Sequence, residues 1–360
     1  MHKTYIIAEA GVNHNGSLEL AKNLVDVAVE AGADAVKFQT FHAEDLVCRN
    51  APKAKYQIKT TEQDESQYSM LKALELSGQE QVELQQYCLQ KKIEFLSSPF
   101  DLKSADFLMR SLNLSTLKIA SGEITNFPLL LKIAQAQRSI ILSTGMSTLG
   151  EIESALALLA WGYLFSTEDP KPSMNCFEKA YFSNEGQSIL QEKISLLHCT
   201  SEYPAPFEEV NLRAMQTMRD AFNLPVGYSD HTLGTAVSIA AVAQGAQIIE
   251  KHFTLDKKMQ GPDHQASLEP HELAALISGI RQVELAIGGR QKLPRQSELK
   301  NRSIARKSLV ALKDVQQGDV FNEHNLGCKR PANGVAPSYY YNVYNKLAGR
   351  DYVEDELIEL

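Results

Sequence analysis

The chain has 360 residues, and 36 lysines and arginines against 44 aspartates and glutamates give a formal net charge of −8. It is 44% hydrophobic and 22% charged, which is typical of a soluble globular protein. No apolar stretch reaches the ~20 residues that span a bilayer, and the start MHKTYIIAEAG is not a signal peptide. The acidic balance argues against a nucleic-acid scaffold. The five cysteines lack CxxC spacing, which argues against a disulfide framework or a thiolate zinc site. We therefore expect a cytoplasmic protein without nucleic-acid or membrane partners.

Short apolar runs alternate with longer amphipathic stretches along the chain. The runs predict eight strands, at Tyr5–Ala8, Ala35–Phe38, Ile93–Ser97, Leu117–Ala120, Ile140–Ser143, Ile194–Cys199, Val226–Ser229 and Ile248–His252. The stretches between them predict helices, among them Leu18–Ala31, Gln79–Lys91, Phe127–Ala136, Ile152–Trp161, Thr235–Gln244 and Glu269–Ile287. Gly32 and Gly245 follow two of these stretches and fit helix C-caps.

Eight successive strand–helix units predict an α/β fold of the (β/α)8 type, a TIM barrel. The alternative is a doubly wound sheet, but no GxGxxG motif follows the first strand. We expect the barrel over residues 1–287, a polar and basic linker over 288–303, and a small β-rich domain over 304–360. Two connections, Thr40–Ser77 and Gly162–Lys193, are longer than ordinary loops between a strand and a helix.

Polar or ionisable side chains follow nearly every predicted strand. In a (β/α)8 barrel these strand ends meet at one mouth, where active sites lie. One serine or one lysine at a strand end has an ordinary structural explanation, but eight polar strand ends together predict a polar pocket. The side chains concerned are Glu9, Lys37, Gln39, Ser97, Ser98, Lys118, Ser121, Glu123, Ser143, Thr144, His198, Ser229, Asp230, His231 and His252.

Two lysines and two histidines in this set suggest its chemistry. Lys37 and Lys118 lie inside apolar runs, so each ammonium group needs an anionic partner. That partner is either a phosphate-bearing substrate, with serine hydroxyls nearby as donors, or a structural carboxylate such as Glu9 or Glu123. His231 and His252 end neighbouring strands and are able to hold a divalent metal, unless both are ordinary core histidines.

Several motifs in order along the chain resemble those of the bacterial sialic acid synthase family. They are IAEAGVNHNG (Ile7–Gly16), AVKFQTF (Ala35–Phe41), KIASGEITNFPLL (Lys118–Leu130), ILSTGM (Ile141–Met146), LHC…EYP (Leu197–Pro204), GYSDHT (Gly227–Thr232), EKHFTLD (Glu250–Asp256) and GPDH (Gly261–His264). The tail motifs ARKSLVA and KRPANG resemble the antifreeze-like (SAF) domain that these synthases carry at the C-terminus. The stretch Gly162–Lys193 has no place in the family pattern.

The resemblance implies an enzyme that condenses phosphoenolpyruvate with an N-acetylated hexosamine and releases phosphate. It implies Mn2+, or Mg2+ or Co2+ as a substitute, on His231 and His252, with Glu123 as an acid/base carboxylate. It assigns the sugar to Gln39, Tyr203, Asp263 and Arg330. It assigns phosphoenolpyruvate to Lys37, Ser98, Lys118, Ser121, Ser143, Ser201 and Ser229. Two positions depart from some members of the family: Ser98 stands for Thr, and Ser201 stands for Asn.

The resemblance leaves the sugar open. We expect N-acetylneuraminate synthase activity on N-acetylmannosamine, with N,N'-diacetyllegionaminate synthase activity on 2,4-diacetamido-2,4,6-trideoxymannose as the alternative. A synthase that uses an aldose phosphate would need more cations on the sugar side, and an ice-binding or carbohydrate-binding protein would not need the histidine pair. The family also implies a homodimer in which Arg330 of each tail reaches the partner's barrel.

Overall fold

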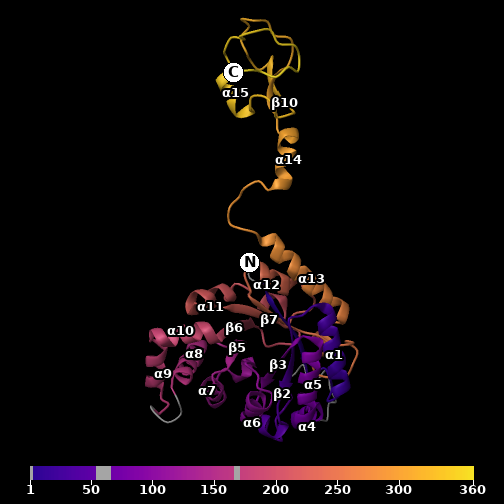
Figure 1. Ribbon diagram of the computed structural model, residues 1–360, viewed down its shortest axis with the longest axis vertical. Coiled ribbons are helices and arrows are strands. Elements are labelled where there is room, and N and C mark those ends of the chain that lie inside the picture. Colours follow the sequence, from indigo (N-terminus) through magenta and orange to yellow (C-terminus); the bar gives the residue numbers. More distant parts are fainter. Residues whose placement is uncertain (1–2, 54–65, 166–170) are drawn as a thin grey trace. The chain divides into compact units, whose positions relative to one another are not determined.

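The computed structural model describes residues 3–53, 66–165 and 171–360 (Figure 1). The chain forms two compact units, which we describe separately. The first extends to Gly288 and the second runs from Gly289 to Leu360. Among the described residues, no helix combines the length and apolar character that crossing a membrane requires.

The described part of the first unit contains eight parallel strands, which form one sheet in the order β3-β2-β1-β8-β7-β6-β5-β4. β3 and β4, at the two ends of this order, also pack against each other and close the sheet into a near-barrel. This confirms the predicted TIM-barrel fold. The strands are β1 (Tyr5–Gly11), β2 (Ala35–Thr40), β3 (Glu94–Pro99), β4 (Thr116–Ile119), β5 (Ser139–Ser143), β6 (Ile194–Cys199), β7 (Val226–Asp230) and β8 (Ile248–His252).

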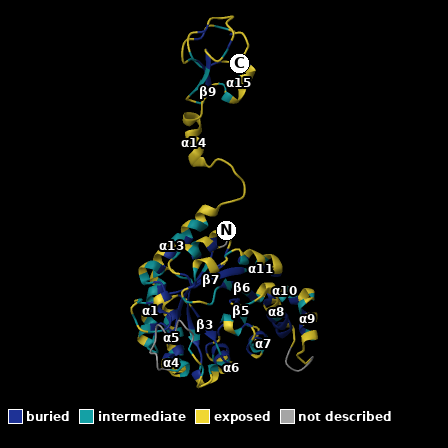
Figure 2. Ribbon diagram, turned by 180° about the vertical axis from the view of Figure 1, so that it is seen from behind, coloured by how far each residue is buried: buried dark blue, intermediate teal, exposed yellow. Residues whose placement is uncertain are grey.

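Helices surround the strands, which are the most deeply buried part of the unit (Figure 2). The helix ends follow ordinary capping chemistry: Ser17 caps the N-terminus of α1, and Gly32 ends α1 in the left-handed conformation. The helices are α1 (Leu18–Ala31), α2 (Ala43–Leu46), α4 (Gln67–Leu74), α5 (Gly78–Lys91), α6 (Leu102–Asp106), α7 (Phe127–Gln135), α8 (Leu149–Leu164), α9 (Met174–Tyr181), α10 (Asn184–Lys193), α11 (Ala214–Phe222), α12 (Ala236–Ala243) and α13 (Pro270–Ile287).

The side chains inside the barrel form layers that change in character along the strands. The lower layer is apolar and consists of Ile7, Ala35, Leu96, Ile141, Leu197 and Ile248. Side chains alternate between the two faces of a strand, so the next inward residue is two positions further along. That second layer is polar and contains Glu9, Lys37, Ser98, Ser143, Ser229 and Glu250. The apolar layer closes the floor, and the polar layer faces the mouth.

Both long connections carry helices. The first contains α2 and α4, and residues 54–65 between them lie outside the described residues. The second contains α9 and α10, which pack against α8. Their packing explains why α8 is apolar on nearly all sides: Trp161 of α8 contacts Phe177 of α9, with ring centroids 5.6 Å apart. The described part of the connection that had no place in the family pattern therefore adds two helices, α9 and α10, against α8.

The second unit has its own small core under an antiparallel pair of strands, β9 (Ser308–Ala311) and β10 (Leu326–Lys329), with a short helix α15 (Tyr340–Val343). Isolated bridges, such as Val310 with Leu357, add to the β structure. The second half of the segment 288–303, for which we expected a linker, is occupied by the start of helix α14 (Gln296–Ala305). Leu, Glu, Lys, Arg and Ala favour a helix there, although the segment is polar.

Candidate active site

A cavity of about 430 Å³ opens at the carboxyl ends of the barrel strands. The structure brings every barrel residue to which the family resemblance assigns a role to this cavity. Ser97, Thr144, His198 and Asp230, which we also expected in the polar pocket, do not line it. Its lining includes Lys37, Gln39, Ser98, Lys118, Ser121, Glu123, Ser143, Ser201, Tyr203, Ser229, His231, His252 and Asp263. Arg330 belongs to the second unit, where its side chain is exposed. The cavity also includes Glu9 and Glu250, which form ion pairs with the two lysines.

Four buried charged side chains form the base of the cavity. Nζ of Lys37 lies 2.7 Å from Oε2 of Glu9 and 3.7 Å from Oε2 of Glu250. Nζ of Lys118 lies 3.1 Å from Oε1 of Glu250. All four side chains are at most 4% exposed. The structural alternative for the lysines is thus partly correct, since Lys37 pairs with Glu9, but Lys118 pairs with Glu250 and not with Glu123.

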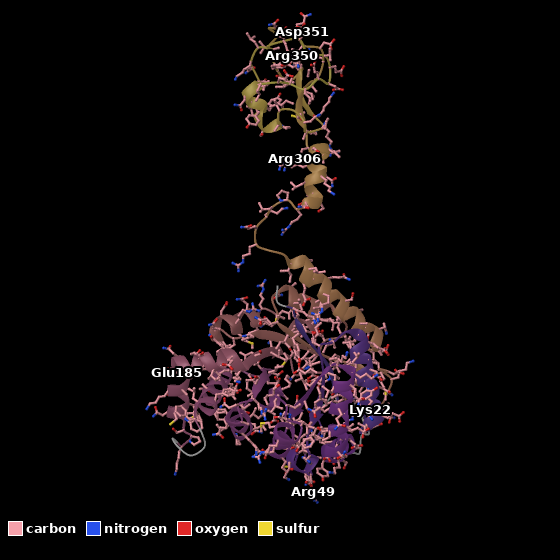
Figure 3. All side chains as sticks on the ribbon, viewed as in Figure 1. Lys22, Arg49, Glu185, Arg306, Arg350 and Asp351 are labelled. Atoms are coloured by element: carbon pink, nitrogen blue, oxygen red, sulfur yellow. The ribbon has the colours of Figure 1, made fainter. Side chains whose placement is uncertain are left out.

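These buried charges differ from the other charged side chains of the barrel unit. Lys22, Arg49 and Glu185 lie at its periphery (Figure 3). Solvent screens such charges, whereas a buried charge interacts strongly with its neighbours. The paired charges at the base of the cavity therefore dominate its electrostatics.

Burial and the neighbouring charges shift the pKa values of Glu9, Glu250 and Lys118 in different directions. Burial raises the pKa of Glu9 to about 7, although Lys37 acts in the opposite direction. Burial also disfavours the charged form of Glu250, but Lys118 and Lys37 outweigh it and lower the pKa of that carboxyl. Burial lowers the pKa of Lys118, which also lies close to the positive charge of Lys37. Near neutral pH, Glu9 therefore carries only part of its charge, and the cavity retains positive charge for an anionic ligand.

Hydroxyl groups surround the lysines. Ser98 accepts a hydrogen bond from Lys37 at 3.2 Å, and Ser229 donates one to Glu250 at 2.8 Å. Oγ of Ser143 is buried and has no hydrogen-bond partner among the described residues. A buried hydroxyl without a partner is costly, so a ligand oxygen is the natural acceptor for it.

A tight backbone turn after β5 brings further donors to the same place. The backbone N–H of Gly145 donates to Oγ of Ser121 at 3.0 Å. A Cβ atom at Gly145 would lie 2.3 Å from Oγ of Ser201, 2.8 Å from Oγ of Ser121 and 3.0 Å from Sγ of Cys199. Only glycine fits there. Ser201 thus lies in the same cluster of hydroxyl groups as Ser121, despite its departure from the family pattern.

The two histidines lie side by side at the mouth, with ring centroids 5.6 Å apart. Nδ1 of His231 donates to the carbonyl of Thr200 at 2.6 Å, which leaves Nε2 as an acceptor. Nδ1 of His252 is buried without a hydrogen-bond partner among the described residues and lies 4.0 Å from Oδ2 of Asp263. Burial lowers the pKa of His231 to about 4 and that of His252 well below its usual value. Nε2 of His231 also lies 3.4 Å from Oγ of Ser229. Neutral imidazole is the form of histidine that binds a divalent metal, so this pair fits such an ion.

The predicted sugar residues lie around the histidines. The ring of Tyr203 lies 4.1 Å from that of His231 and 5.6 Å from that of His252, between centroids. Burial raises the pKa of Asp263 to about 6, although Lys37 acts against it. A Cβ atom at Gly11 would lie 3.4 Å from both Nε2 of Gln39 and Cε1 of His252. The absence of a side chain at Gly11 therefore leaves space between these two side chains.

Glu123 lies at the rim of the cavity, on a short 3-10 turn after β4. Its carboxylate accepts a hydrogen bond from the side chain of Asn126 at 2.6 Å. Burial raises the pKa of Glu123, which favours a group that can both hold and release a proton.

Two other polar groups near the strand ends serve the fold or have other partners. Nε2 of His198 is hydrogen-bonded to the carbonyl of Val210 at 2.7 Å, which agrees with a structural histidine. His42, Asp45 and Asp101 hold potential metal ligands within 4.8 Å of one another. However, Asp45 pairs with Lys103, and Asp101 caps helix α6. Their carboxylates are therefore already used.

Sequence reasoning missed Glu250. Glu250 lies in the predicted strand Ile248–His252 and in the motif EKHFTLD, but neither pattern assigns it a role. The alternation of side chains along a strand would have found it, since Glu250 is two residues before His252 and must share its face. Glu9 was expected only as a structural partner of a buried lysine, and it does pair with Lys37.

The chain matches the NeuB family over residues 24–292 and the SAF domain over residues 306–359. A relative from Campylobacter jejuni, N,N'-diacetyllegionaminic acid synthase, is 53% identical over 358 residues, which cover 99% of each chain. A protein of the same name from Legionella pneumophila is 46% identical over 339 residues, 94% of this chain and 88% of that one. The crystal structure of an N-acetylneuraminic acid synthetase from Leptospira borgpetersenii covers 83% of this chain and 90% of its own, with 32% identity and a TM-score of 0.66. The chain therefore belongs to the NeuB family and is a nonulosonate synthase with a C-terminal SAF domain.

Proposed function

We propose that the protein is an N,N'-diacetyllegionaminate synthase that condenses phosphoenolpyruvate with 2,4-diacetamido-2,4,6-trideoxymannose and releases phosphate. The observation that carries the proposal is the 53% identity to the Campylobacter jejuni enzyme of that name, over 99% of both chains. Our sequence-based preference for N-acetylmannosamine is less well supported. The human relative named N-acetylneuraminate-9-phosphate synthase is only 34% identical.

Phosphoenolpyruvate would bind at the base of the cavity, through Lys37, Lys118 and the hydroxyl cluster of Ser98, Ser121, Ser143, Ser201 and Ser229. The cations and donors suit its phosphate and carboxylate oxygens. When Glu9 takes up a proton, Lys37 is released from its ion pair and becomes available to the substrate. Two substrates held in one rigid mouth need little further ordering before they react.

His231 and His252 would hold the metal, Mn2+ or a substitute such as Mg2+ or Co2+. The metal would supply Lewis-acid polarisation of the sugar's aldehyde oxygen. The side chains of Gln39, Tyr203 and Asp263 border the histidines and would orient the open-chain sugar.

The carbon–carbon bond forms between the methylene carbon of phosphoenolpyruvate and the sugar aldehyde. Water then adds to the former enol carbon, and the resulting tetrahedral species expels phosphate. Glu123 would exchange protons with the reacting groups from the rim. Lys37 and Lys118 would stabilise the negative charge on the departing phosphate.

A turnover assay with both sugars, side by side, tests the proposed substrate. Phosphate release from phosphoenolpyruvate should be faster, at equal concentrations, with the diacetamido trideoxy sugar than with N-acetylmannosamine. A clear preference for N-acetylmannosamine would contradict the proposal.

We also propose that the protein works as a homodimer in which Arg330 of each tail contacts the sugar bound in the partner's barrel. The family resemblance of KRPANG supports this role, and a guanidinium group suits an acetamido carbonyl. Arg330→Ala and Glu123→Ala subunits, each nearly inactive, should regain activity when mixed. Random exchange gives about a quarter of the wild-type sites intact, because half the dimers are mixed and each has one complete site. No recovery after confirmed subunit exchange would refute the swapped arrangement.

A further inference from the structure

One side of the cavity is an apolar wall, which the proposed chemistry has not used. Seven hydrophobic side chains form a cluster that is separate from the barrel core, and all seven line the cavity. The members of this apolar wall are Val12, Phe41, Leu46, Met70, Leu71, Leu74 and Phe100. They come from the loops after β1, β2 and β3 and from helices α2 and α4.

Helix α4 contributes a continuous stripe to the wall. Gln67, Met70, Leu71 and Leu74 all line the cavity, and their spacing of three and four residues places them on one face of the helix. The three apolar members fill most of the stripe, and Gln67 at its beginning is the polar one. The opposite face of α4 carries exposed residues, among them Ala73.

The character of the cavity changes with depth along the strands. On β2 and just beyond it, Lys37, Gln39 and Phe41 alternate onto the same face and all line the cavity. The sequence runs from a buried cation, through an amide, to an aromatic ring. On β3, Ser98 is followed in the same way by Phe100, whose ring lies 6.3 Å from that of Phe41. If the anionic substrate binds at the base, as proposed above, the second substrate has the apolar wall beside it.

We propose that the apolar wall receives the C6 methyl group and an acetamido methyl group of a 6-deoxy diacetamido sugar, and so selects such a sugar against a 6-hydroxylated one. This inference rests on the proposed function. A sugar that carries a hydroxyl group at C6 would leave that group against hydrocarbon without a partner, which is costly. A methyl group at the same place gains from burial. The amide of Gln67 is available to a second acetamido group.

Three sugars separate these contributions in the wild-type enzyme: 2,4-diacetamido-2,4,6-trideoxymannose, N-acetylmannosamine and 6-deoxy-N-acetylmannosamine. The last two differ only in the hydroxyl at C6. The 6-deoxy sugar should have a kcat/KM about tenfold to a hundredfold higher than N-acetylmannosamine, the range that one group in an apolar pocket provides. This measurement requires no mutation.

Leu71→Gln makes the wall polar at a half-buried position, and Ala73→Gln adds the same side chain to the outer face of α4 as the matched control. In Leu71→Gln the preference for the 6-deoxy sugar should fall about tenfold, while the KM for phosphoenolpyruvate stays the same. Ala73→Gln should behave as the wild type. If Leu71→Gln does not fold, Leu46→Gln, at another half-buried wall position, takes its place.

The outcomes distinguish the two proposals. A wild-type preference for N-acetylmannosamine over the diacetamido sugar refutes the proposed function and, with it, the role of the wall. A wild-type preference for the diacetamido sugar, together with equal rates for the two sugars that differ at C6, or with an unchanged preference in Leu71→Gln, refutes the wall alone.

Discussion

The barrel strands carry two groups of buried charges, one on each face of the sheet, and the two groups differ in how completely their polar atoms are paired. The inner group is Glu9, Lys37, Lys118 and Glu250, and the outer pair is Asp230 and Lys251. On the outer face, Asp230 and Lys251 are direct neighbours in the sheet, with Oδ2 and Nζ 3.0 Å apart. Asp230 also accepts hydrogen bonds from the side chains of Thr232 at 2.8 Å and Ser238 at 2.6 Å. Lys251 donates to the carbonyl of Thr232. This outer pair has a full set of partners.

On the inner face, the arrangement is incomplete. Glu250 serves both Lys37 and Lys118, and Ser143 has no partner among the described residues. The two faces do not differ in burial, because the side chains of Asp230 and Lys251 are as inaccessible to solvent as those of the inner group. At this cavity, the unpaired hydroxyl of Ser143 beside buried charges distinguishes the inner face from the fully paired outer face, and a ligand would complete its hydrogen bonds.

Among substitutions on the inner face, loss of a metal ligand should lower turnover the most. His252→Ala, or His231→Ala, should lower turnover on the order of a thousandfold, because Lewis-acid assistance is worth several kcal/mol. The free energy of unfolding should change little in comparison. Titration calorimetry with Mn2+ provides a second readout, in which binding should disappear. Activity that survives in either variant after treatment with a chelator would remove the metal assignment.

Breaking the outer pair should affect stability instead. Asp230→Asn leaves the Lys251 ammonium buried without its counter-charge, and we expect a loss of about 3 kcal/mol in the free energy of unfolding. Urea denaturation measures this loss. At a temperature where the variant is folded, its KM for phosphoenolpyruvate should equal that of the wild type. If the KM for phosphoenolpyruvate rises as much in Asp230→Asn as in Lys118→Ala, the two faces do not have the separate roles that we infer.

Lys118→Ala should change binding of the anion selectively. The ammonium group lies at the base of the cavity, and a charge-assisted hydrogen bond contributes about 1.5–3 kcal/mol, so the KM for phosphoenolpyruvate should rise about tenfold to a hundredfold. The KM for the sugar should change far less. Steady-state kinetics with each substrate varied in turn measures both values. An effect confined to the sugar would show that Lys118 is not an anion ligand.

Much of the barrel and its site could be predicted from the sequence because the signals are local. Each strand is a short apolar run, and the polar residue that ends it must lie at the mouth, so thirteen predicted side chains meet at one cavity. What is not local was missed. The pairing of Lys118 with Glu250 joins β4 to β8 across the barrel, and nothing in either segment indicates which charge lies opposite.

The apolar wall was also beyond prediction. Met70, Leu71 and Leu74 lie in a long connection whose helix is short, and their apolar pattern is the same as that of any helix packed on a core. Only the fold shows that this face meets the cavity. The helix α14 was missed for a different reason, because a polar, exposed helix has no apolar face to reveal it.

Titration of Glu9 should have the smallest effect. With a pKa raised by burial to about 7, Glu9 is largely protonated below neutral pH. Lys37 then keeps only its longer contact with Glu250, at 3.7 Å, and interacts more strongly with an anionic substrate. Ionisation at higher pH restores the ion pair, so the KM for phosphoenolpyruvate should rise about threefold to tenfold between about pH 6 and pH 8. Glu9→Gln, which cannot ionise, should show a smaller rise, and the difference between the two profiles isolates Glu9 from the titration of the substrate phosphate.

Glu9 should also make the free energy of unfolding depend on pH. The pKa of Glu9 rises from the ordinary value of 4.5 to about 7 on folding, so unfolding releases a proton between these two pH values. The contribution of Glu9 to the free energy of unfolding should therefore fall as the pH rises through this window, and level off above it. Urea denaturation at a series of pH values measures this, with Glu9→Gln as the reference. If the wild type and the variant show the same pH dependence in both experiments, Glu9 does not titrate near neutrality, and its ion pair with Lys37 persists across this pH range.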